Sequence, residues 1–217
     1  RNLGLFSATI SQEVMTVSWM YQRDEVEITV RPEAESRPDI TQYSITVPPL
    51  EKVNTVLLLL RTMAFERTII FCNTKAMCQR LSDDLRRAGV DADCIHGDIA
   101  QQKREKTMRT FKEGRLPVLI ATDVASRGID VDDVDCVLNY DVPQENEYYI
   151  HRIGRTGRAK KKGVAISIIG NFPEQAKLDE IAKYSHYEIQ RVKFLDDGTL
   201  VEEEVKKPKP APRRRFR

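Results

Sequence analysis

The sequence predicts an α/β fold in which a parallel β-sheet carries helices on both faces. Short runs of mostly apolar residues alternate along the chain with longer segments in which apolar residues recur at helical spacing. Strands that are apolar at nearly every position are typical of sheets buried on both faces, and their alternation with helices indicates parallel connections. Polar strings follow several of these runs, and ligands of such sheets gather at the carboxyl ends of the strands. We therefore expect a binding site along that edge.

The expected strands and helices follow one another in a regular order. Buried strands are expected at 40–47, 68–72, 92–95, 118–121, 136–138 and 164–169. Pro49 opens a helix after the first of them. Residues 74–88 form a second helix, since apolar residues recur on one face and Gly89 stands past its end. A further helix is expected to start near 141–143, with acids in its first turn, and to run to about Ile153.

Length and composition place the chain among globular proteins. Its 217 residues suffice for one large domain or one domain with flanking pieces, and they are 41% hydrophobic and 31% charged. The longest apolar run, 56–60, is far too short to cross a bilayer, so no membrane contact is expected. The cysteines form no CxxC pair and are interpreted as reduced core thiols, as in cytosolic proteins. The expected localisation is therefore cytoplasmic, and no metal site is expected.

Charge and proline divide the chain into four parts. Residues 31–38 are charged and carry two prolines, which predicts a linker between residues 1–30 and a main domain at 39–195. Residues 196–217 are expected to form a flexible basic tail. Its last twelve residues carry seven positive charges and no negative ones, so the remainder of the chain has a net charge of −5 within a total of +2. Such a tail attracts nucleic acid without sequence preference, although a merely solubilising role is an equal alternative.

The stretch YIHRIGRTGR, at 149–158, covers the end of the last of these helices. Gly154 and Gly157 favour a tight turn where the helix has to stop. Arg155 and Arg158 would then project from a turn that is fixed to a rigid element. Guanidinium groups are always charged and fork-shaped, which suits them to phosphate oxygens. For two arginines at this spacing, a surface ion-pair network is the plain alternative.

This string resembles motif VI of the DEAD-box RNA helicases. The resemblance implies that Arg155 and Arg158 are catalytic arginine fingers, which reach the terminal phosphate of ATP across an interdomain cleft and typically raise the rate ~10³- to 10⁵-fold. His151 and Arg152 complete the motif and are assigned to coupling between the domains. The histidine favours this family over DNA-directed and DEAH relatives, in which glutamine is usual at this place.

The segment ATDVASRGID follows an expected strand directly and resembles motif V of the same family. The resemblance implies that Thr122 contacts an RNA phosphate. It also implies that the Gly128 backbone and the Asp130 carboxylate approach the nucleotide, with Asp130 accepting from the ribose hydroxyls. Asp123 and Arg127 would link the two sites. A lone TD or RG pair would indicate only a turn, but this match extends over the whole segment.

Asn73, Thr74 and Lys75 stand at the start of the helix that follows the strand at 68–72. A helix N-terminus with hydroxyl and amide side chains is a natural phosphate site. An ordinary asparagine or threonine cap explains the same residues equally well. Resemblance to motif IV of the family implies that Thr74 contacts an RNA phosphate.

His96 and Gly97 follow the strand at 92–95, and Gln101 and Arg104 lie one turn apart on the next helix. The pattern HGDxxQxxR resembles the family segment whose backbone amides and arginine grip the RNA strand. These four residues are therefore expected to bind RNA. On its own, His96 would more simply be a turn histidine with its hydrogen bonds satisfied.

Ser7 and Thr9, in the string SAT, resemble motif III of the family. That motif belongs to the first of two RecA-like domains and couples ATP state to RNA binding. Residues 14–21 are expected to form an amphipathic helix and 26–30 a strand. On the family pattern, residues 1–30 are thus the end of a first domain. A Ser/Thr helix cap is the alternative interpretation of the string.

The resemblance as a whole implies the second RecA-like domain, the helicase C-terminal domain, of an ATP-dependent RNA helicase. The sequence holds no GxxxxGK[ST] loop and no DEAD string, so the chain by itself should not hydrolyse ATP. ATP with Mg²⁺ would be bound mainly by the N-terminal RecA-like domain of the same protein, and RNA would be the other partner. The rival interpretations are a DNA-directed helicase of the same superfamily and a non-enzymatic module that binds RNA or a protein.

Overall fold

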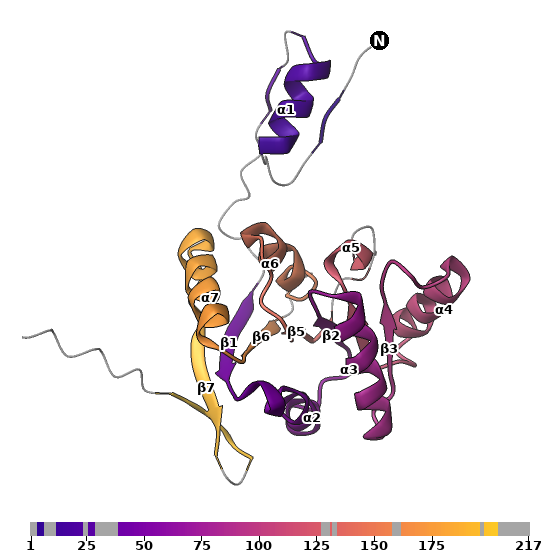
Figure 1. Ribbon diagram of the computed structural model, residues 1–217, viewed down its shortest axis with the longest axis vertical. Helices are drawn as coiled ribbons and strands as arrows, with labels where there is room; N and C mark the ends of the chain where they lie inside the picture. Colours follow the sequence, from indigo (N-terminus) through magenta and orange to yellow (C-terminus); the bar gives the residue numbers. More distant parts are fainter. Residues whose placement is uncertain are drawn as a thin grey trace, which may run out of the picture. The chain divides into compact units, whose positions relative to one another are not determined.

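The computed structural model describes residues 4–6, 12–23, 26–28, 39–126, 131, 134–157, 162–195 and 198–203. The chain divides into two compact units, Arg1–Arg37 and Pro38–Arg217. The larger unit contains the sheet and most of the predicted site residues (Figure 1). None of the helices in the described ranges has the length and apolar character that a bilayer span requires.

The larger unit is built on an eight-stranded sheet in the order β3-β4-β2-β5-β6-β1-β7-β8. The strands are β1 (Ile40–Thr46), β2 (Thr68–Phe71), β3 (Ala92–Ile95), β4 (Val118–Ala121), β5 (Cys136–Asn139), β6 (Gly163–Ile169), β7 (Gln190–Phe194) and β8 (Leu200–Glu202). Neighbouring strands are parallel except β7 and β8, which are antiparallel. The six strands expected from the sequence are confirmed to within one residue at either end.

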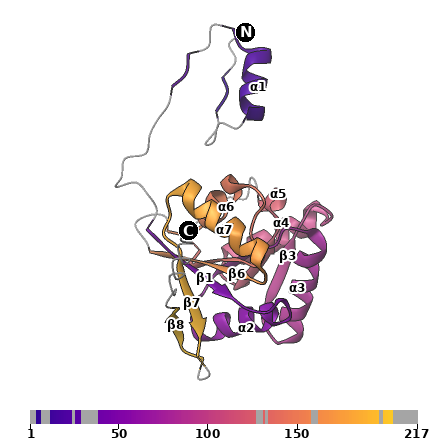
Figure 2. The ribbon, with the colours of Figure 1, turned by 60° about the vertical axis from the view of Figure 1, so that its left-hand side comes forward.

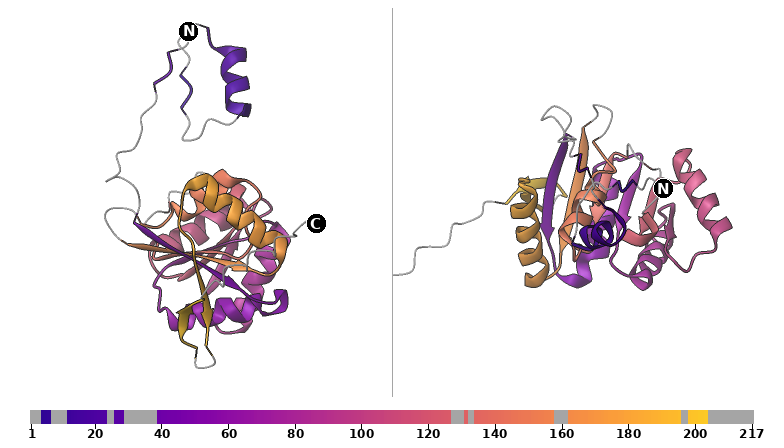
Figure 3. Two further views of the ribbon diagram at one scale, coloured as in Figure 1. Left: turned by 90° about the vertical axis from the view of Figure 1, so that its left-hand side faces the viewer. Right: turned by 90° about the horizontal axis from the view of Figure 1, so that it is seen from above.

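Helices cover both faces of the sheet, which confirms the predicted fold class (Figure 3). They are the short 3-10 helix η2 (Pro49–Glu51), α2 (Lys52–Thr62), α3 (Lys75–Arg87), α4 (Gln101–Lys112), α5 (Asp123–Ser126), α6 (Asn146–Ile153) and α7 (Phe172–Ser185). The helix predicted at 74–88 is α3, and Gly89 beyond it has φ +83°. That left-handed conformation is the usual glycine stop of a helix.

Alternate residues of the strands pack into different cores, because successive strand side chains point to opposite faces. Ile70 of β2 packs in one cluster with Val56 of α2 and Leu81 of α3. Phe71, the next residue, packs in another cluster with Phe111 of α4. Every residue of β2, β4 and β5 is buried, which is why these strands read as continuous apolar runs. The four cysteines are free and buried.

Helix α6 begins later than the sequence predicts. The predicted start near 141–143 is wrong, because α6 begins at Asn146 and the residue before it has an extended backbone (φ −99°, ψ 137°). A residue that precedes proline is disfavoured in the helical region, and Val142 precedes Pro143. The predicted end at Ile153 is confirmed.

The sheet also extends beyond the predicted main domain. Strand β8 pairs with β7, with Leu200 opposite Phe194 (Figure 2). The flexible tail predicted from residue 196 therefore starts too early. Strands β7 and β8 are short and half-buried and have little apolar periodicity, so the sequence does not predict them. Residues 204–217 of the tail lie outside the described residues.

The smaller unit contains α1 (Gln12–Tyr21) where the sequence predicts a helix at 14–21. Its apolar side chains Trp19 and Met20 are exposed, so the helix does not bury an apolar face within the described part of its own unit. Of the strand predicted at 26–30, residues 26–28 are described and form no strand, and residues 29 and 30 lie outside the described residues. A strand requires a hydrogen-bonded neighbour.

Candidate functional site

Four neighbouring strands end along one edge of the sheet, and the predicted polar strings begin there. Asn73 follows β2, His96 follows β3, Thr122 follows β4 and Asp141 follows β5. Because these strands are parallel and consecutive in the order β3-β4-β2-β5, the four residues form one row. We call this row the carboxyl edge.

Arg152 of α6 lies behind the carboxyl edge as a buried, paired charge. Its side chain is 1% exposed, and Nε and Nη2 donate to the two carboxylate oxygens of Asp123 at 2.6 and 2.7 Å. Asp123 begins α5, which is separated from β4 by Thr122 alone. Such bidentate, charge-assisted bonds are strong and directional. Removing one partner of a buried pair costs about 3–5 kcal/mol, because the other charge is left uncompensated.

The same guanidinium also donates to the ends of two strands. Nη2 donates to Oδ1 of Asn73 at 2.8 Å, and Nη1 donates to the backbone oxygen of Asp141 at 2.7 Å and to Oδ1 of Asn139 at 3.3 Å. The group lies 5.2 Å from the ring centroid of Phe71, within range of a cation–π interaction. Arg152 therefore joins α6 to α5 and to the ends of β2 and β5.

Asn73 and Asp141 bind one another next to this arginine. The backbone N–H of Asn73 donates to Oδ2 of Asp141 at 2.9 Å, and its side-chain Nδ2 donates to the backbone oxygen of Val142 at 2.8 Å. The sequence predicts Asn73 as a helix cap or phosphate contact, but it does not predict that Asn139 and Asp141 belong to the site. Their signal was a polar residue at the end of an apolar run, which gains meaning only when β5 is placed beside β2.

Burial changes how Arg152 can take part in the predicted interdomain coupling. In this conformation its guanidinium is inaccessible to another domain, whereas the Asp123 side chain is 18% exposed and His151 is exposed on α6. A contribution of Arg152 to coupling would therefore pass through the position of Asp123.

The start of α3 carries one predicted RNA contact and one residue that was not singled out. Thr74 is the N-cap, and its Oγ1 accepts from the N–H of Met77 at 3.1 Å, while the hydroxyl keeps its own hydrogen to donate. Lys75 pairs with Asp98, with 2.6 Å between Nζ and Oδ1, and its Cε lies 3.4 Å from where a Cβ on Gly97 would be. The hydrogen bond from Lys75 lowers the pKa of Asp98.

His96 is buried at the carboxyl edge with one nitrogen unsatisfied. Its residue is 7% exposed, and Nδ1 accepts from the N–H of Asp98 at 3.4 Å. The other nitrogen, Nε2, is buried and has no hydrogen-bond partner within the described part of the chain. A turn histidine with both nitrogens satisfied is therefore not what the structure contains. A buried unsatisfied nitrogen calls for a partner such as water or a ligand.

Gln101 and Arg104 lie in the first turn of α4, next to the carboxyl edge. Nε2 of Gln101 donates to Oε1 of Glu105 at 2.8 Å. Nη2 of Arg104 donates to the backbone oxygen of Ala125 in α5 at 2.7 Å. This bond ties the start of α4 to the segment that follows β4, in which Thr122 is buried, with 7% of its surface exposed.

The turn after α6 lies at the other edge of the sheet, where the strands begin. The N–H of Val134, ahead of β5, donates to the backbone oxygen of Arg155 at 3.2 Å. Thr156 forms a parallel bridge with Val134 and donates through Oγ1 to its backbone oxygen. The sequence predicts one binding site along the carboxyl edge, but Arg155 does not lie there. Helix α6 runs back along the sheet and carries half-buried Arg155 to the amino ends of the strands.

Gly157 confirms the tight turn that the sequence predicts. Its φ is +69°, and a Cβ at this position would lie 2.6 Å from Cγ1 of Ile40 and 3.0 Å from the backbone oxygen of Asp39. Both the conformation and the close approach require glycine. Gly154, by contrast, has an ordinary φ of −64°.

Several predicted residues lie outside the described residues. They are Ser7, Thr9, Arg127, Gly128, Asp130 and Arg158. Within the described ranges, no three His, Cys, Asp or Glu side chains are placed to hold a metal ion. The described part of the site supplies hydrogen-bond donors and positive charge, which suit phosphate groups.

Comparisons with known proteins give the chain a context. A family model described as "Helicase conserved C-terminal domain" matches residues 51–160. The chain is 39% identical over 210 residues to the ATP-dependent RNA helicase DbpA of Bacillus subtilis, covering 97% of this chain and 43% of that protein. It is 41% identical over 198 residues to the DEAD-box ATP-dependent RNA helicase CshA of Bacillus cereus, covering 91% of this chain and 37% of that protein.

Solved structures agree with these sequence matches. S. cerevisiae Dbp5 bound to RNA and ADP BeF3 superimposes with a TM-score of 0.77 at 33% identity, covering 86% of this chain and 50% of that one. This chain thus spans less than half the length of the two curated relatives and about half of this solved structure.

Proposed function

The chain belongs to the DEAD-box RNA helicases and contains their C-terminal helicase domain, and from this premise we propose that it is one half of an ATP-driven motor that separates RNA strands. The observation that carries the proposal is the division of the site residues between two places. Phosphate-suited groups line the carboxyl edge, and Arg155 stands at the amino ends of the strands. An RNA strand and a nucleotide would occupy these two places.

Arg155 and Arg158 are proposed as the catalytic arginine fingers. They would act on the terminal phosphate of ATP held mainly by an N-terminal RecA-like domain of the same protein. A finger stabilises developing charge best when its position is set beforehand. The Arg155 backbone supports this role, since its N–H donates to the oxygen of Arg152 at 3.2 Å and its own oxygen accepts from Val134.

Gly128 and Asp130 are proposed to complete the nucleotide site from this side. Mg²⁺, when bound, neutralises the charge of the transferred phosphate. The described residues include no acidic cluster that would hold the ion. We therefore assign it to the N-terminal domain.

The residues proposed to hold the RNA backbone share the carboxyl edge. They are Thr74, His96, Gly97, Gln101, Arg104 and Thr122. Helices α3 and α4 both begin here, and neither has an acidic residue in its first turn, so their N-termini favour an anion. Because contacts to phosphate and sugar carry little sequence information, RNA binding should be largely independent of sequence.

Coupling between the two places is proposed to pass through Asp123, Arg127, His151 and Arg152, with Ser7 and Thr9 on the N-terminal side. Support comes from the described network, in which Arg152 touches the carboxyl edge and lies three residues before Arg155. A displacement of the residues at the carboxyl edge would therefore move Arg155, and a displacement of Arg155 would move those residues.

Three further properties belong to the same proposal. The protein acts in the cytoplasm, the basic tail adds non-specific RNA binding, and this chain alone does not hydrolyse ATP. The last follows because both arginines would act on a nucleotide that the chain does not hold by itself.

The test compares this chain with the full-length helicase, by which we mean the polypeptide in which it follows its N-terminal RecA-like domain. ATP hydrolysis is measured for both, without nucleic acid, with RNA and with single-stranded DNA. We expect turnover in the full-length protein only, stimulated by RNA and not by DNA. Stimulation by DNA would favour the DNA-directed alternative, and no stimulated hydrolysis would favour a non-enzymatic binding module.

A further inference from the structure

Helix α4 carries a basic face that the proposed site does not use. The helix has five cations and one acid among its twelve residues. Four of the cations are exposed: Lys103, Lys106, Arg109 and Lys112. We call them the α4 basic face. The helix packs beside β3, the edge strand of the sheet, so this face lies at one end of the larger unit (Figure 1).

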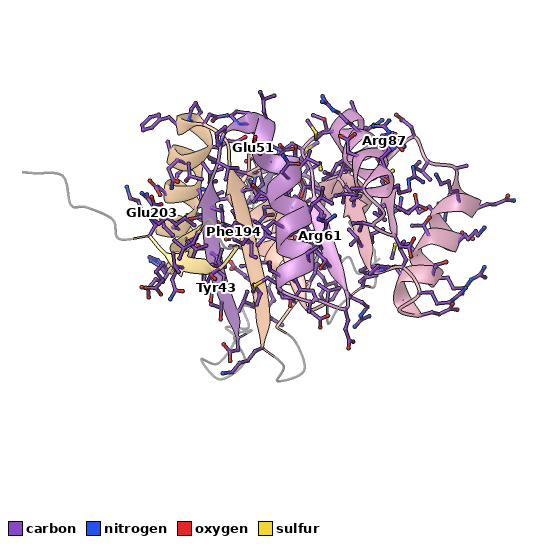
Figure 4. All side chains as sticks on the ribbon, turned by 90° about the horizontal axis from the view of Figure 1, so that it is seen from below. Tyr43, Glu51, Arg61, Arg87, Phe194 and Glu203 are labelled. Atoms are coloured by element: carbon purple, nitrogen blue, oxygen red, sulfur yellow. The ribbon has the colours of Figure 1, made fainter. Side chains whose placement is uncertain are left out.

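Helix α3 shows how this protein usually treats exposed arginines. Arg86 pairs with Asp83 at 2.6 Å, and Arg87 pairs with Asp84 at 2.7 Å. Each cation thus has an acid three residues away on the same helix. Figure 4 shows Arg87 on α3, on the face of the sheet opposite to α4.

Lys106 and Arg109 of α4 are not neutralised in this way. Its one acid, Glu105, accepts from Gln101 at 2.8 Å, and Lys103 reaches Asp93 only at 3.9 Å. No acid in the described ranges lies within ion-pair distance of Lys106 or Arg109. Like charges three residues apart on a helix repel each other, so the helix is less stable than it would be with acids among them. An external polyanion would remove this repulsion.

The α4 basic face differs in charge from the chain around it. Residues 1–205 have a net charge of −5, so the positive charge of this face is local and does not reflect a basic surface overall. A local concentration of positive charge on such a body selects partners by electrostatic attraction.

We propose that the α4 basic face binds the phosphates of RNA that extends beyond the carboxyl edge. This rests on the proposed function. Gln101 and Arg104, two of the proposed RNA contacts, lie in the first turn of the same helix. Twelve helical residues span about 18 Å, so the basic face continues from the proposed groove toward the amino ends of the strands. It lengthens the RNA site without adding sequence specificity.

The test neutralises the two unpaired cations in the full-length helicase with the double substitution Lys106→Gln/Arg109→Gln. Glutamine keeps a high helix propensity. The matched control is Arg61→Gln/Lys183→Gln, which removes two exposed cations from α2 and α7. Arg61 is labelled on α2 in Figure 4. Binding to a short RNA that fills only the groove, and to one roughly twice as long, is measured over a series of salt concentrations.

The wild-type protein should bind the longer RNA more tightly and with a steeper salt dependence. Each lost phosphate contact reduces the slope of log K against log salt by about 0.7 for a single strand, so the double variant should be shallower by about 1.4 on the longer RNA. Between about 50 and 200 mM salt this makes its loss of affinity about sevenfold smaller. The short RNA and the control variant should show no change.

Three results for the variants would overturn the inference: an unchanged slope in the double variant, an equal change on the short RNA, or an equal change in the control. Failure of the proposed RNA site at the carboxyl edge looks different, since then the wild-type protein would bind neither RNA. Binding of both RNAs with no dependence on length would reject the α4 basic face alone.

Discussion

Arg152 and Arg155 lie three residues apart in one motif, yet the protein treats them in opposite ways. Arg152 is buried, and its guanidinium is bound to Asp123, Asn73 and the end of β5. Arg155 is half-buried, and backbone hydrogen bonds to Arg152 and Val134 hold it at the opposite edge of the sheet. Arg152 thus holds helices and strands together, whereas Arg155 is positioned by the turn that follows α6.

The difference shows that a motif is not a list of equivalent contacts. The arginines of the motif show where a positive charge is needed. The burial of each side chain then indicates whether that charge stabilises the fold or is available to a ligand. A buried guanidinium with all its bonds made to the protein has no capacity left for a phosphate. The four predictions below test this division, from the largest expected effect to the smallest.

Replacing Arg152 should damage the fold. Arg152→Ala in this chain removes the guanidinium that is bound to the partly buried carboxylate of Asp123, and should lower the free energy of unfolding by about 3–5 kcal/mol in urea titrations. Arg152→Lys keeps the charge but not the fork, so its loss should be intermediate. The exposed control Arg61→Ala should change stability by less than about 0.5 kcal/mol. A loss below about 1 kcal/mol for Arg152→Ala would mean that the network is dispensable.

Replacing Arg155 should damage catalysis and not the fold. In the full-length helicase, Arg155→Ala should lower RNA-stimulated ATP turnover by about 10³-fold, because an arginine finger acts on charge that develops only in the transition state. Its free energy of unfolding should change by about 1 kcal/mol or less. An unfolding loss as large as that of Arg152→Ala would remove the distinction between the two arginines.

Gly157→Ala should destabilise the turn that places Arg155. A left-handed conformation alone costs about 1–2 kcal/mol for alanine, and here the new Cβ also meets Ile40 at 2.6 Å. Gly89→Ala is the matched control, since its φ of +83° is similar but nothing lies within 4 Å of the added atom. Urea titrations should show a larger loss for Gly157→Ala. Equal losses would show that the approach to Ile40 is easily relieved.

The smallest effect concerns the exposed pair at the carboxyl edge. Lys75→Met should raise the pKa of Asp98 toward its ordinary value, as followed by carboxyl-carbon NMR shifts during an acid titration. Because the folded-state pKa is lowered, the pair stabilises the fold above the unfolded-state pKa, and this stabilisation is lost as pH falls through the folded-state pKa. An unchanged pKa would show that Lys75 does not hold Asp98 in solution.

The sequence predicted the strands well because both faces of the sheet are covered. In β2, β4 and β5 every side chain is buried, so each strand is a bounded apolar run. The tight turn at Gly157 was also predictable, since a glycine after a helix has a local meaning. The start of α6 could not be predicted, because Pro143 suits both the first turn of a helix and the loop before it.

The buried network around Arg152 could not be predicted from the sequence, for a different reason. Asp141 and Asn139 matter through Arg152 and Asn73, which are distant in the sequence and meet only because β5 lies beside β2. Hydropathy also places arginine at the surface, so its complete burial contradicts the usual expectation. The short strand β8 was missed because its signal comes from its pairing with β7 and not from its own residues.

A structure of the full-length helicase with RNA and ADP BeF3 would test the division most directly. We predict that the Arg155 guanidinium lies within hydrogen-bond distance of the beryllium fluoride, while Arg152 keeps both bonds to Asp123. Arg155 directed away from the nucleotide, or Arg152 released from Asp123 to bind it, would contradict the account.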